Sequence, residues 1–223
     1  MSDDELQSVA MVGGTGPLGR GLAGRLAVAG ITVWLGSRDG ARAEAVARAT
    51  SEMLPASAAA IVGTENQRAI QQASLTVIAI PYDALAAQLS ALTGLDGGRV
   101  VVSTAVPMAF DKGVPTAVRP EAGSAAQLVQ AICPDARVVG ALHTVAAGQL
   151  LRFDDVLDED VLVCGDDPAA CDVVRALVAR IPGLRPVAAG GLAVAGACEG
   201  ITPLLLRLNR LHRAQTGIRI TGL

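Results

Sequence analysis

The chain has 223 residues, of which 51% are hydrophobic and only 2% aromatic, and its formal net charge is −3. The apolar fraction excludes intrinsic disorder, because disordered chains combine low hydrophobicity with high net charge. The slightly acidic balance and the few aromatic residues argue against nucleic-acid binding, which needs a basic surface or stacking platforms. Residues 1–5 are acidic, unlike a secretory signal, and no uncharged apolar run reaches about 18 residues. We therefore expect a cytoplasmic protein without membrane helices.

Short apolar runs alternate with helix-like segments over most of the chain. The expected strands are residues 8–12, 32–35, 60–62, 75–80, 99–103 and 137–142. The expected helices are residues 17–29, 41–53, 67–73, 82–92 and 124–132. The apolar runs are continuous rather than alternating, which is typical of parallel strands covered on both faces. The pattern predicts an α/β fold with a doubly wound parallel sheet of the Rossmann type.

The last third of the chain is predicted to form a smaller C-terminal α/β lobe, with residues 1–148 and 149–223 as the two domains. Its expected elements are strands at residues 161–164 and 184–188, a helix at 168–181, and a long helix at 192–213. Pro203 would produce a kink in that long helix. Residues 107–123 are rich in proline and glycine and are expected to form a long loop, a common place for function.

A glycine-rich loop follows the first expected strand. Gly14, Gly16 and Gly19 have the spacing G-x-G-x-x-G, and they lead from a strand into a helix. In this context the first glycine permits a tight turn, the second lets the backbone approach a pyrophosphate, and the third lets helix and strand pack closely. The unpaired N–H groups of the helix N-terminus favour a phosphate. The loop therefore predicts a dinucleotide site.

The end of the second expected strand indicates which dinucleotide is bound. A NAD site usually has an acid about 20 residues after the glycines, whereas this chain has Ser37 and Arg38 there. A hydroxyl and a guanidinium suit the 2′-phosphate of NADP, and Arg42 would lie one helical turn beyond Arg38. Asp39 is the nearby acid, and we interpret it as the N-cap of the next helix. The sequence thus predicts NADP rather than NAD.

Further motifs follow in a specific order. They are Gly36-Ser37-Arg38, Leu142-His143-Thr144, Cys164-Gly165-Asp166-Asp167 and Thr202-Pro203-Leu204. Together with the glycine loop they resemble the F420-dependent NADP oxidoreductases. The resemblance extends over nearly the whole chain, and it implies hydride transfer between NADP and coenzyme F420, an 8-hydroxy-5-deazaflavin.

The resemblance also implies which residues contact the two cofactors. For NADP they are Thr15, Gly16, Pro17, Leu18, Ser37, Arg38, Arg42, Tyr82, Ala86, Met108 and Ala147. His143 and Thr216 would lie beside the deazaflavin, although Thr216 replaces an apolar residue of the family. His143 is the candidate catalytic residue, either as a polar contact to the ring or as a proton donor. The alternative is a histidine satisfied by the backbone at a strand end.

Direct hydride transfer needs little acid–base chemistry from the protein, because the two reacting carbons need only be held about 3–3.5 Å apart. We therefore expect no metal site and no covalent nucleophile, and the four cysteines are expected to be free thiols. Two other functions stay open: an NADPH-dependent reductase of a small imine or keto substrate, and a non-catalytic NADP-sensing module. A homodimer is expected from the resemblance and from the small-residue segment 190–197.

Overall fold

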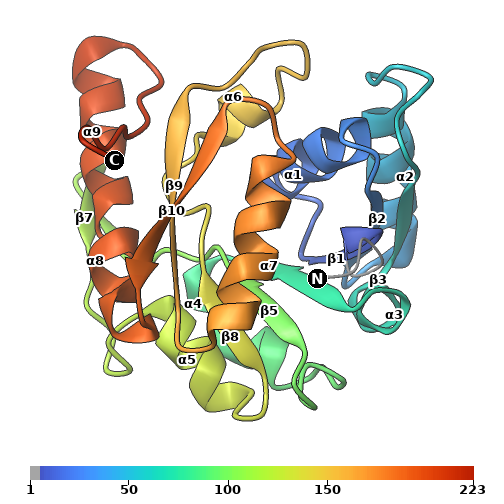
Figure 1. Cartoon of the computed structure of the whole chain (residues 1–223), viewed down its shortest axis with the longest axis horizontal. Coiled ribbons are helices and arrows are strands. Elements are labelled where there is room, and N and C mark those ends of the chain that lie inside the picture. The colour runs from blue at the N-terminus through green and yellow to red at the C-terminus, as the bar shows by residue number, and fades with distance from the viewer. Residues whose placement is uncertain (1–5) are drawn as a thin grey trace.

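The computed structural model describes residues 6–223 (Figure 1). Residues 1–5, on which the expectation about a secretory signal depends, lie outside the described part. One eight-stranded sheet runs through the molecule in the order β10-β9-β8-β5-β4-β1-β2-β3. These strands are β1 (Ser8–Val12), β2 (Thr32–Ser37), β3 (Ile61–Glu65), β4 (Leu75–Ile78), β5 (Val100–Ser103), β8 (Arg137–Gly140), β9 (Glu159–Gly165) and β10 (Leu184–Gly190).

The strands from β3 to β8 are all parallel, which confirms the predicted α/β fold of the Rossmann type. The last two strands extend the same sheet, and β9 runs antiparallel to β8 while β10 is parallel to β9. Residues 149–223 therefore continue the sheet of the first 148 residues, and the domain boundary near residue 148 stays a prediction. Within residues 6–223, no helix has the length and apolarity that are needed to cross a membrane.

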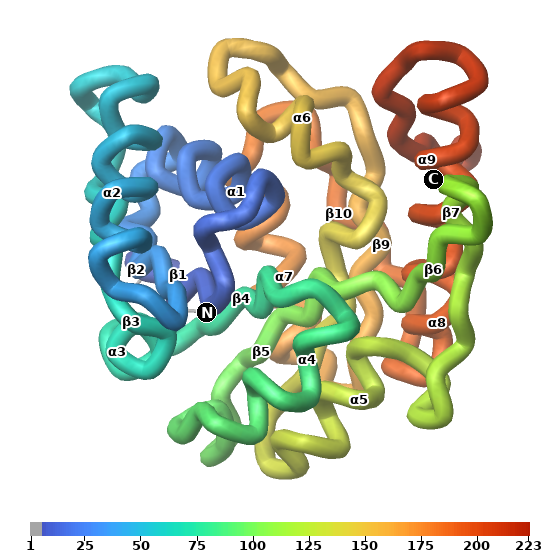
Figure 2. The backbone as a smooth tube through the Cα atoms, turned by 180° about the vertical axis from the view of Figure 1, so that it is seen from behind, coloured from blue at the N-terminus to red at the C-terminus, as the bar shows by residue number. Residues whose placement is uncertain are grey.

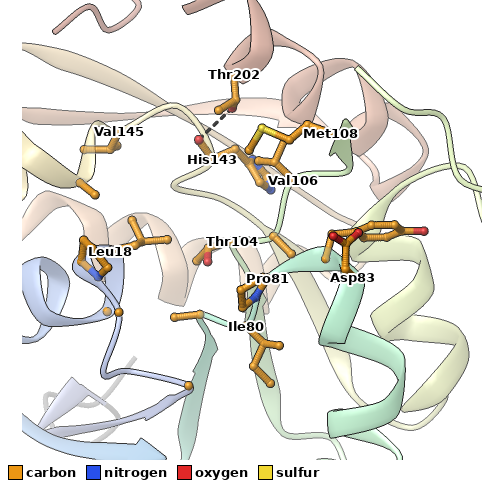
Figure 3. A pocket seen from close by; sticks show the side chains of 18 of the residues that line it. Leu18, Ile80, Pro81, Asp83, Thr104, Val106, Met108, His143, Val145 and Thr202 are labelled. Carbon is orange, nitrogen blue, oxygen red and sulfur yellow. Dashed lines mark hydrogen bonds between the residues drawn. The ribbon is translucent and has the colours of Figure 1, made fainter. Parts of the chain in front are cut away.

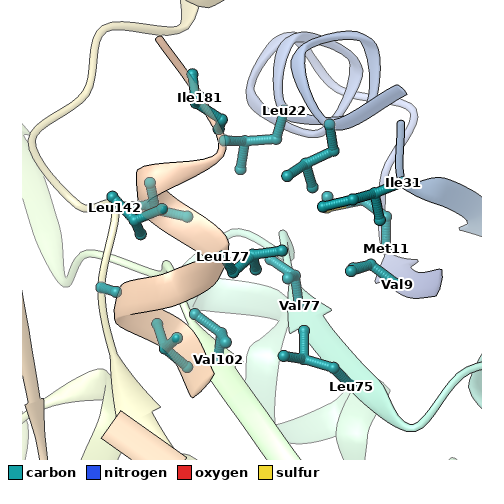
Figure 4. Close-up of a cluster of buried hydrophobic side chains, with 14 of the residues drawn as sticks. Val9, Met11, Leu22, Ile31, Leu75, Val77, Val102, Leu142, Leu177 and Ile181 are labelled. Carbon is teal, nitrogen blue, oxygen red and sulfur yellow. The ribbon is translucent and has the colours of Figure 1, made fainter. Parts of the chain in front are cut away.

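Helices cover both faces of the sheet. One face carries α1 (Pro17–Val28), α2 (Gly40–Ser51), α6 (Ala147–Leu150) and α7 (Pro168–Ala179), and the other α3 (Asn66–Gln72), α4 (Tyr82–Leu89), α5 (Ala125–Ile132) and α8 (Ala195–Glu199). Side chains alternate along each strand, so Val9 and Met11 of β1 pack on the first face with Leu22 and Leu177 (Figure 4). Val12 packs on the opposite face. Burial on both faces explains the continuous apolar runs.

Two helices of the first face begin at acidic N-caps. Asp39 Oδ1 accepts the backbone N–H of Arg42 at 3.1 Å, and Asp167 Oδ1 accepts that of Ala170 at 2.7 Å. A carboxylate in this position satisfies one of the unpaired N–H groups of the first turn. The interpretation of Asp39 as the cap of α2 is confirmed.

A β-hairpin occupies part of the expected loop 107–123, and there the prediction was wrong. Its strands are β6 (Met108–Asp111) and β7 (Val114–Ala117), and they pair in antiparallel register. Lys112 and Gly113 form the turn with φ of 47° and 78°, which matches the right-handed twist of a hairpin. The strands are short and mostly exposed, so no apolar run marks them in the sequence. The hairpin lies beside α9 (Ile201–His212), as both views of the chain show (Figures 1 and 2).

The expected long helix 192–213 consists of three pieces. A 3₁₀ turn at Leu192–Val194 leads into α8, and Gly200 separates α8 from α9. The break therefore lies at Gly200, and the predicted kink at Pro203 was misplaced. Pro203 is in the first turn of α9, where a missing N–H is tolerated because that group has no partner within the helix.

Candidate functional site

A cleft of about 920 Å³ lies at the carboxyl ends of the parallel strands, partly shown in Figure 3. Its walls come from the glycine loop, the end of β2, the segments after β4, β5 and β8, the β6–β7 hairpin and α9. The volume is near the upper end of the range of about 300–1,000 Å³ that ligand sites usually have. Open α/β sheets bind their ligands at this edge, so the cleft is the candidate site.

Most of the predicted site residues line this cleft. They are Thr15, Gly16, Pro17, Leu18, Gly19, Ser37, Arg38, Arg42, Tyr82, Met108, His143, Ala147 and Thr216. Gly14 and Ala86 do not line it. Gly14 lies behind the loop, where its N–H donates to the Gly36 carbonyl at 2.9 Å, and Ala86 is exposed one turn beyond Tyr82. Cofactor contacts at these two residues stay predictions.

The glycine loop leaves open space at one position and none at another. A Cβ on Gly16 would meet no atom within 4 Å, whereas a Cβ on Gly19 would lie 2.5 Å from Gly14 Cα. Gly16 precedes α1 without a side-chain cap, and Pro17 begins the helix. A ligand can therefore approach the backbone at Gly16 and the N-terminal N–H groups of α1. Asn66, which no motif in the sequence marks, also supports the loop, because its Oδ1 accepts the Gly13 N–H at 3.0 Å.

Two arginines provide positive charge at the end of β2. Arg38 and Arg42 are exposed and line the cleft, and within residues 6–223 neither guanidinium has an ion-pair partner. Ser37 is buried beside them and its Oγ accepts the Asp39 N–H at 3.2 Å, so its hydroxyl proton stays available for a ligand. A phosphate with two negative charges fits this set of donors.

His143 lies in the wall of the cleft after β8, with its side chain 7% exposed. The preceding Leu142 has φ of 64°, and Thr202 Oγ1 donates to the His143 carbonyl at 2.8 Å (Figure 3). Nε2 of the imidazole is buried without a partner among residues 6–223. Burial lowers the pKa of His143 to about 4, so the ring is neutral at pH 7. With the proton on Nδ1, Nε2 can accept a hydrogen bond from a ligand.

The structure also brings to the cleft residues that were not expected there from the sequence. They include Thr104, Phe110, Leu205 and Asn209. Thr104 follows β5 directly, so the rule that strand ends carry ligand residues would have found it. Phe110, Leu205 and Asn209 come from the hairpin and α9, whose position beside the sheet no local pattern indicates. Two of the aromatic residues, Tyr82 and Phe110, thus line the cleft.

The chain is similar in sequence to a known family of oxidoreductases. Residues 8–107 match the family model described as "NADP oxidoreductase coenzyme F420-dependent". The F420-dependent NADP reductase of Methanocaldococcus jannaschii is 37% identical over 220 residues, covering 96% of this chain and 98% of that protein. The chain belongs to the F420-dependent NADP reductase family. The reductase of Methanothermobacter marburgensis, also an F420-dependent NADP reductase, is 35% identical with the same coverage.

A solved structure agrees with this membership. A crystal structure described as that of a "putative f420 dependent nadp-reductase" from an Arthrobacter species has a TM-score of 0.79 and 27% identity. It covers 97% of this chain and 99% of its own. The similarity therefore includes the C-terminal strands and α9, which close one end of the cleft in this member of the F420-dependent NADP reductases.

The segment that brings Thr216 to the cleft is held by acidic residues at the start of β9. Asp160 is fully buried, accepts two hydrogen bonds from Arg185 at 2.8 and 2.7 Å and one from Arg219 at 2.9 Å, and also accepts the Ile220 N–H at 2.5 Å. Its own N–H donates to the Ile218 carbonyl at 2.8 Å. Arg185 holds the pKa of Asp160 well below its usual range, so this carboxylate stays ionised.

Glu159 lies beside this carboxylate but has no partner. Its side chain is 3% exposed, and neither carboxyl oxygen has a hydrogen bond within the described residues. The side chain packs against Gly217, where a Cβ would lie 2.2 Å from Glu159 Cδ. Burial raises the pKa of Glu159 from 4.5 to about 7, and the charge of Asp158 acts in the same direction.

We expect Glu159→Gln to stabilise the protein increasingly as the pH rises from 5 to 8. Between pH 4.5 and 7 an unfolded chain releases the Glu159 proton while the folded chain keeps it. This group therefore stabilises the fold fully below pH 4.5 and loses that effect as the pH rises through 7, a change of roughly 3 kcal/mol. Urea unfolding of both proteins at pH 5, 6, 7 and 8 measures the difference. A difference independent of pH would contradict the raised pKa.

Proposed function

We propose that this protein transfers a hydride between NADP(H) and coenzyme F420 within the cleft. The observation that carries the proposal is the continuity of one cleft from two unpaired arginines, past the glycine loop, to His143 and α9. The names of the related proteins support it. When bound side by side, the nicotinamide supplies or accepts the hydride and the deazaflavin does the opposite.

The residues of the cleft fit the parts of NADP in order. Arg38, Arg42 and Ser37 would bind the 2′-phosphate, and the N-terminus of α1 at Gly16 would bind the pyrophosphate. Met108 and Ala147 also line the cleft and would bound the nicotinamide. Residues 149–223 would complete the deazaflavin end with α9 and Thr216. The buried edge of the cleft would keep water away from the reacting carbons.

His143 would orient a ligand rather than donate a proton. A pKa of about 4 leaves the imidazole neutral at pH 7, and the unpartnered Nε2 then accepts a hydrogen bond. Direct hydride transfer is consistent with this role because no proton has to leave the protein. A reductase of imine or keto substrates would need a proton donor at the imine nitrogen or carbonyl oxygen, and an imidazole with a pKa of about 4 is a poor donor at neutral pH.

A spectrophotometric assay tests the proposed function. Reduced F420 and NADP are mixed with the enzyme, and the visible band of oxidised F420 is followed as it appears. Turnover with F420 and none with small imines or ketones supports the proposal. NADP binding without turnover of either substrate class would instead indicate the NADP-sensing module.

Arg38→Ala should reduce the preference for NADPH over NADH by roughly tenfold to a hundredfold, because a charge-assisted hydrogen bond contributes about 1.5–3 kcal/mol. The preference is the ratio of kcat/KM for NADPH to kcat/KM for NADH, with F420 as the acceptor. Arg48→Ala, an exposed arginine at the other end of α2, is the matched control and should leave the ratio unchanged. An unchanged ratio in Arg38→Ala would remove this residue from the 2′-phosphate site.

We also propose that the protein is a cytoplasmic homodimer. The side chains of Phe110, Leu204 and Leu211 are 65%, 56% and 74% exposed on the hairpin and α9, which lie beside each other. Such exposed apolar residues favour a contact with a second copy. The free cysteines at 133, 164, 171 and 198 favour a reducing compartment. Light scattering coupled to size exclusion tests the dimer.

A further inference from the structure

The side chain of Asn209 holds the segment that follows the C-terminal end of α9. Arg213 has φ of 50° and reverses the chain after the helix, and the Ala214 N–H donates to the Asn209 carbonyl at 3.2 Å. Thr216 then returns to the helix and donates twice to Asn209 Oδ1, from its backbone N–H at 2.6 Å and from Oγ1 at 2.7 Å. Asn209 and Thr216 both line the cleft.

These two bonds fix the orientation of the Asn209 amide. A backbone N–H can only donate, so the atom that faces Thr216 must be the amide oxygen and not the nitrogen. The Asn209 NH₂ group therefore points away from Thr216, and within residues 6–223 it has no hydrogen-bond partner. The amide has two N–H donors whose direction is set before any ligand arrives.

The N–H donors of Asn209 lie at the end of the cleft formed by α9 and the hairpin. The cations that line the cleft, Arg38 and Arg42, lie at the end of β2, whereas Asn209 lies on α9 beside the hairpin. In Figure 1, α2 and α9 are at opposite sides of the molecule. The donors of Asn209 therefore belong to the end of the cleft that lies away from the proposed 2′-phosphate site.

We propose that the Asn209 amide donates a hydrogen bond to a carbonyl oxygen of the deazaflavin pyrimidinedione ring. The inference rests on the proposed function. Arrival of the hydride at carbon 5 leaves negative charge on the nitrogen and carbonyl groups of that ring, so a fixed neutral donor stabilises the reduced form more than the oxidised form. Because Thr216 holds the amide in place, no side-chain ordering is needed when F420 binds.

Asn209→Asp is the sharpest test, because aspartate keeps an oxygen for both Thr216 bonds and removes the N–H donors, while the negative charge that it adds is controlled by a second variant. We expect the dissociation constant of oxidised F420, titrated by its absorbance without NADP, to rise about tenfold, which corresponds to one hydrogen bond of about 1.4 kcal/mol. The dissociation constant of NADPH, titrated by fluorescence, and the thermal midpoint should not change. In turnover of F420 with NADPH, kcat/KM for F420 should fall while KM for NADPH stays constant.

His212→Asp controls for the added negative charge. His212 is exposed at the end of α9 and does not line the cleft, so this variant changes the charge near the site without removing a donor. If it weakens F420 binding as much as Asn209→Asp does, or if Asn209→Asp binds F420 like the wild type, the inference is wrong. Weaker NADPH binding in Asn209→Asp would place the donor at the nicotinamide instead and also overturn it. Failure of the wild type to bind F420 would reject the proposed function itself.

Discussion

Arg25→Met should lower the free energy of unfolding by about 3–5 kcal/mol, because it leaves several backbone carbonyls without their donor at about 1–3 kcal/mol for each buried unsatisfied group. Arg25 is on α1 and is 3% exposed. Its guanidinium donates to the carbonyls of Leu150 at 3.1 Å and Gln149 at 3.0 Å, and also to those of Arg152 and Asp155. Methionine fills a similar length but leaves all four carbonyls without this donor.

Urea unfolding of the two proteins at pH 7 measures this loss. Arg48→Met is the matched control, because Arg48 is an exposed helix arginine and its replacement should change stability by less than about 0.5 kcal/mol. The carbonyls that Arg25 binds lie in α6 and the turn after it, next to the cleft residue Ala147. We therefore also expect a higher KM for NADP. A loss of stability below about 1 kcal/mol would show that water replaces the guanidinium without cost.

The nucleotide half of the site could be predicted because its signals are local. Gly16 and Gly19 are three residues apart where the loop leads into α1, and Arg38 follows β2 directly, so spacing alone places them. Asp39 was recognisable as an N-cap for the same reason, since a cap acts on the N–H three residues later. Each of these assignments depends on a few consecutive residues whose secondary structure was evident.

The other half of the site depends on contacts between distant parts of the chain. Asn66 reaches Gly13 across 53 residues, and α9 meets the hairpin at Gly113, whose carbonyl accepts from Arg210 at 3.1 Å. The hairpin itself gives no apolar pattern, because its side chains are mostly exposed. Thr216 could be placed only through the resemblance to the family, and that route does not reveal Asn209 as the residue that holds it.

The antiparallel direction of β9 also could not be predicted from local sequence patterns. Its apolar run reads like that of a parallel strand, because β9 is also buried on both faces. What sets its direction is the path after β8, where the short helix α6 and a turn lead back without crossing the sheet. Arg25 fixes this turn from α1, a contact that the sequence does not indicate because it joins residues more than a hundred positions apart.

Two alanine substitutions in the glycine loop should separate ligand binding from folding. Gly16 has φ of −77° and ψ of 170°, which alanine adopts without strain, and its added Cβ meets no protein atom. We expect Gly16→Ala to lose less than about 1 kcal/mol of stability. Its methyl group would occupy the space through which a pyrophosphate approaches the backbone, so the dissociation constant of NADPH should rise at least about tenfold.

Gly19→Ala should do the reverse, because its Cβ would lie 2.5 Å from Gly14 Cα and 2.6 Å from the Gly14 carbonyl oxygen. Both atoms belong to the backbone, so the loop or α1 must move, at a cost of about 1–3 kcal/mol or more. Thermal unfolding without ligand and a fluorescence titration of NADPH measure the two effects in both variants. If Gly16→Ala binds NADPH like the wild type, the pyrophosphate does not lie against this loop. If Gly19→Ala keeps full stability, the close packing of α1 on the loop is not what requires glycine at this position.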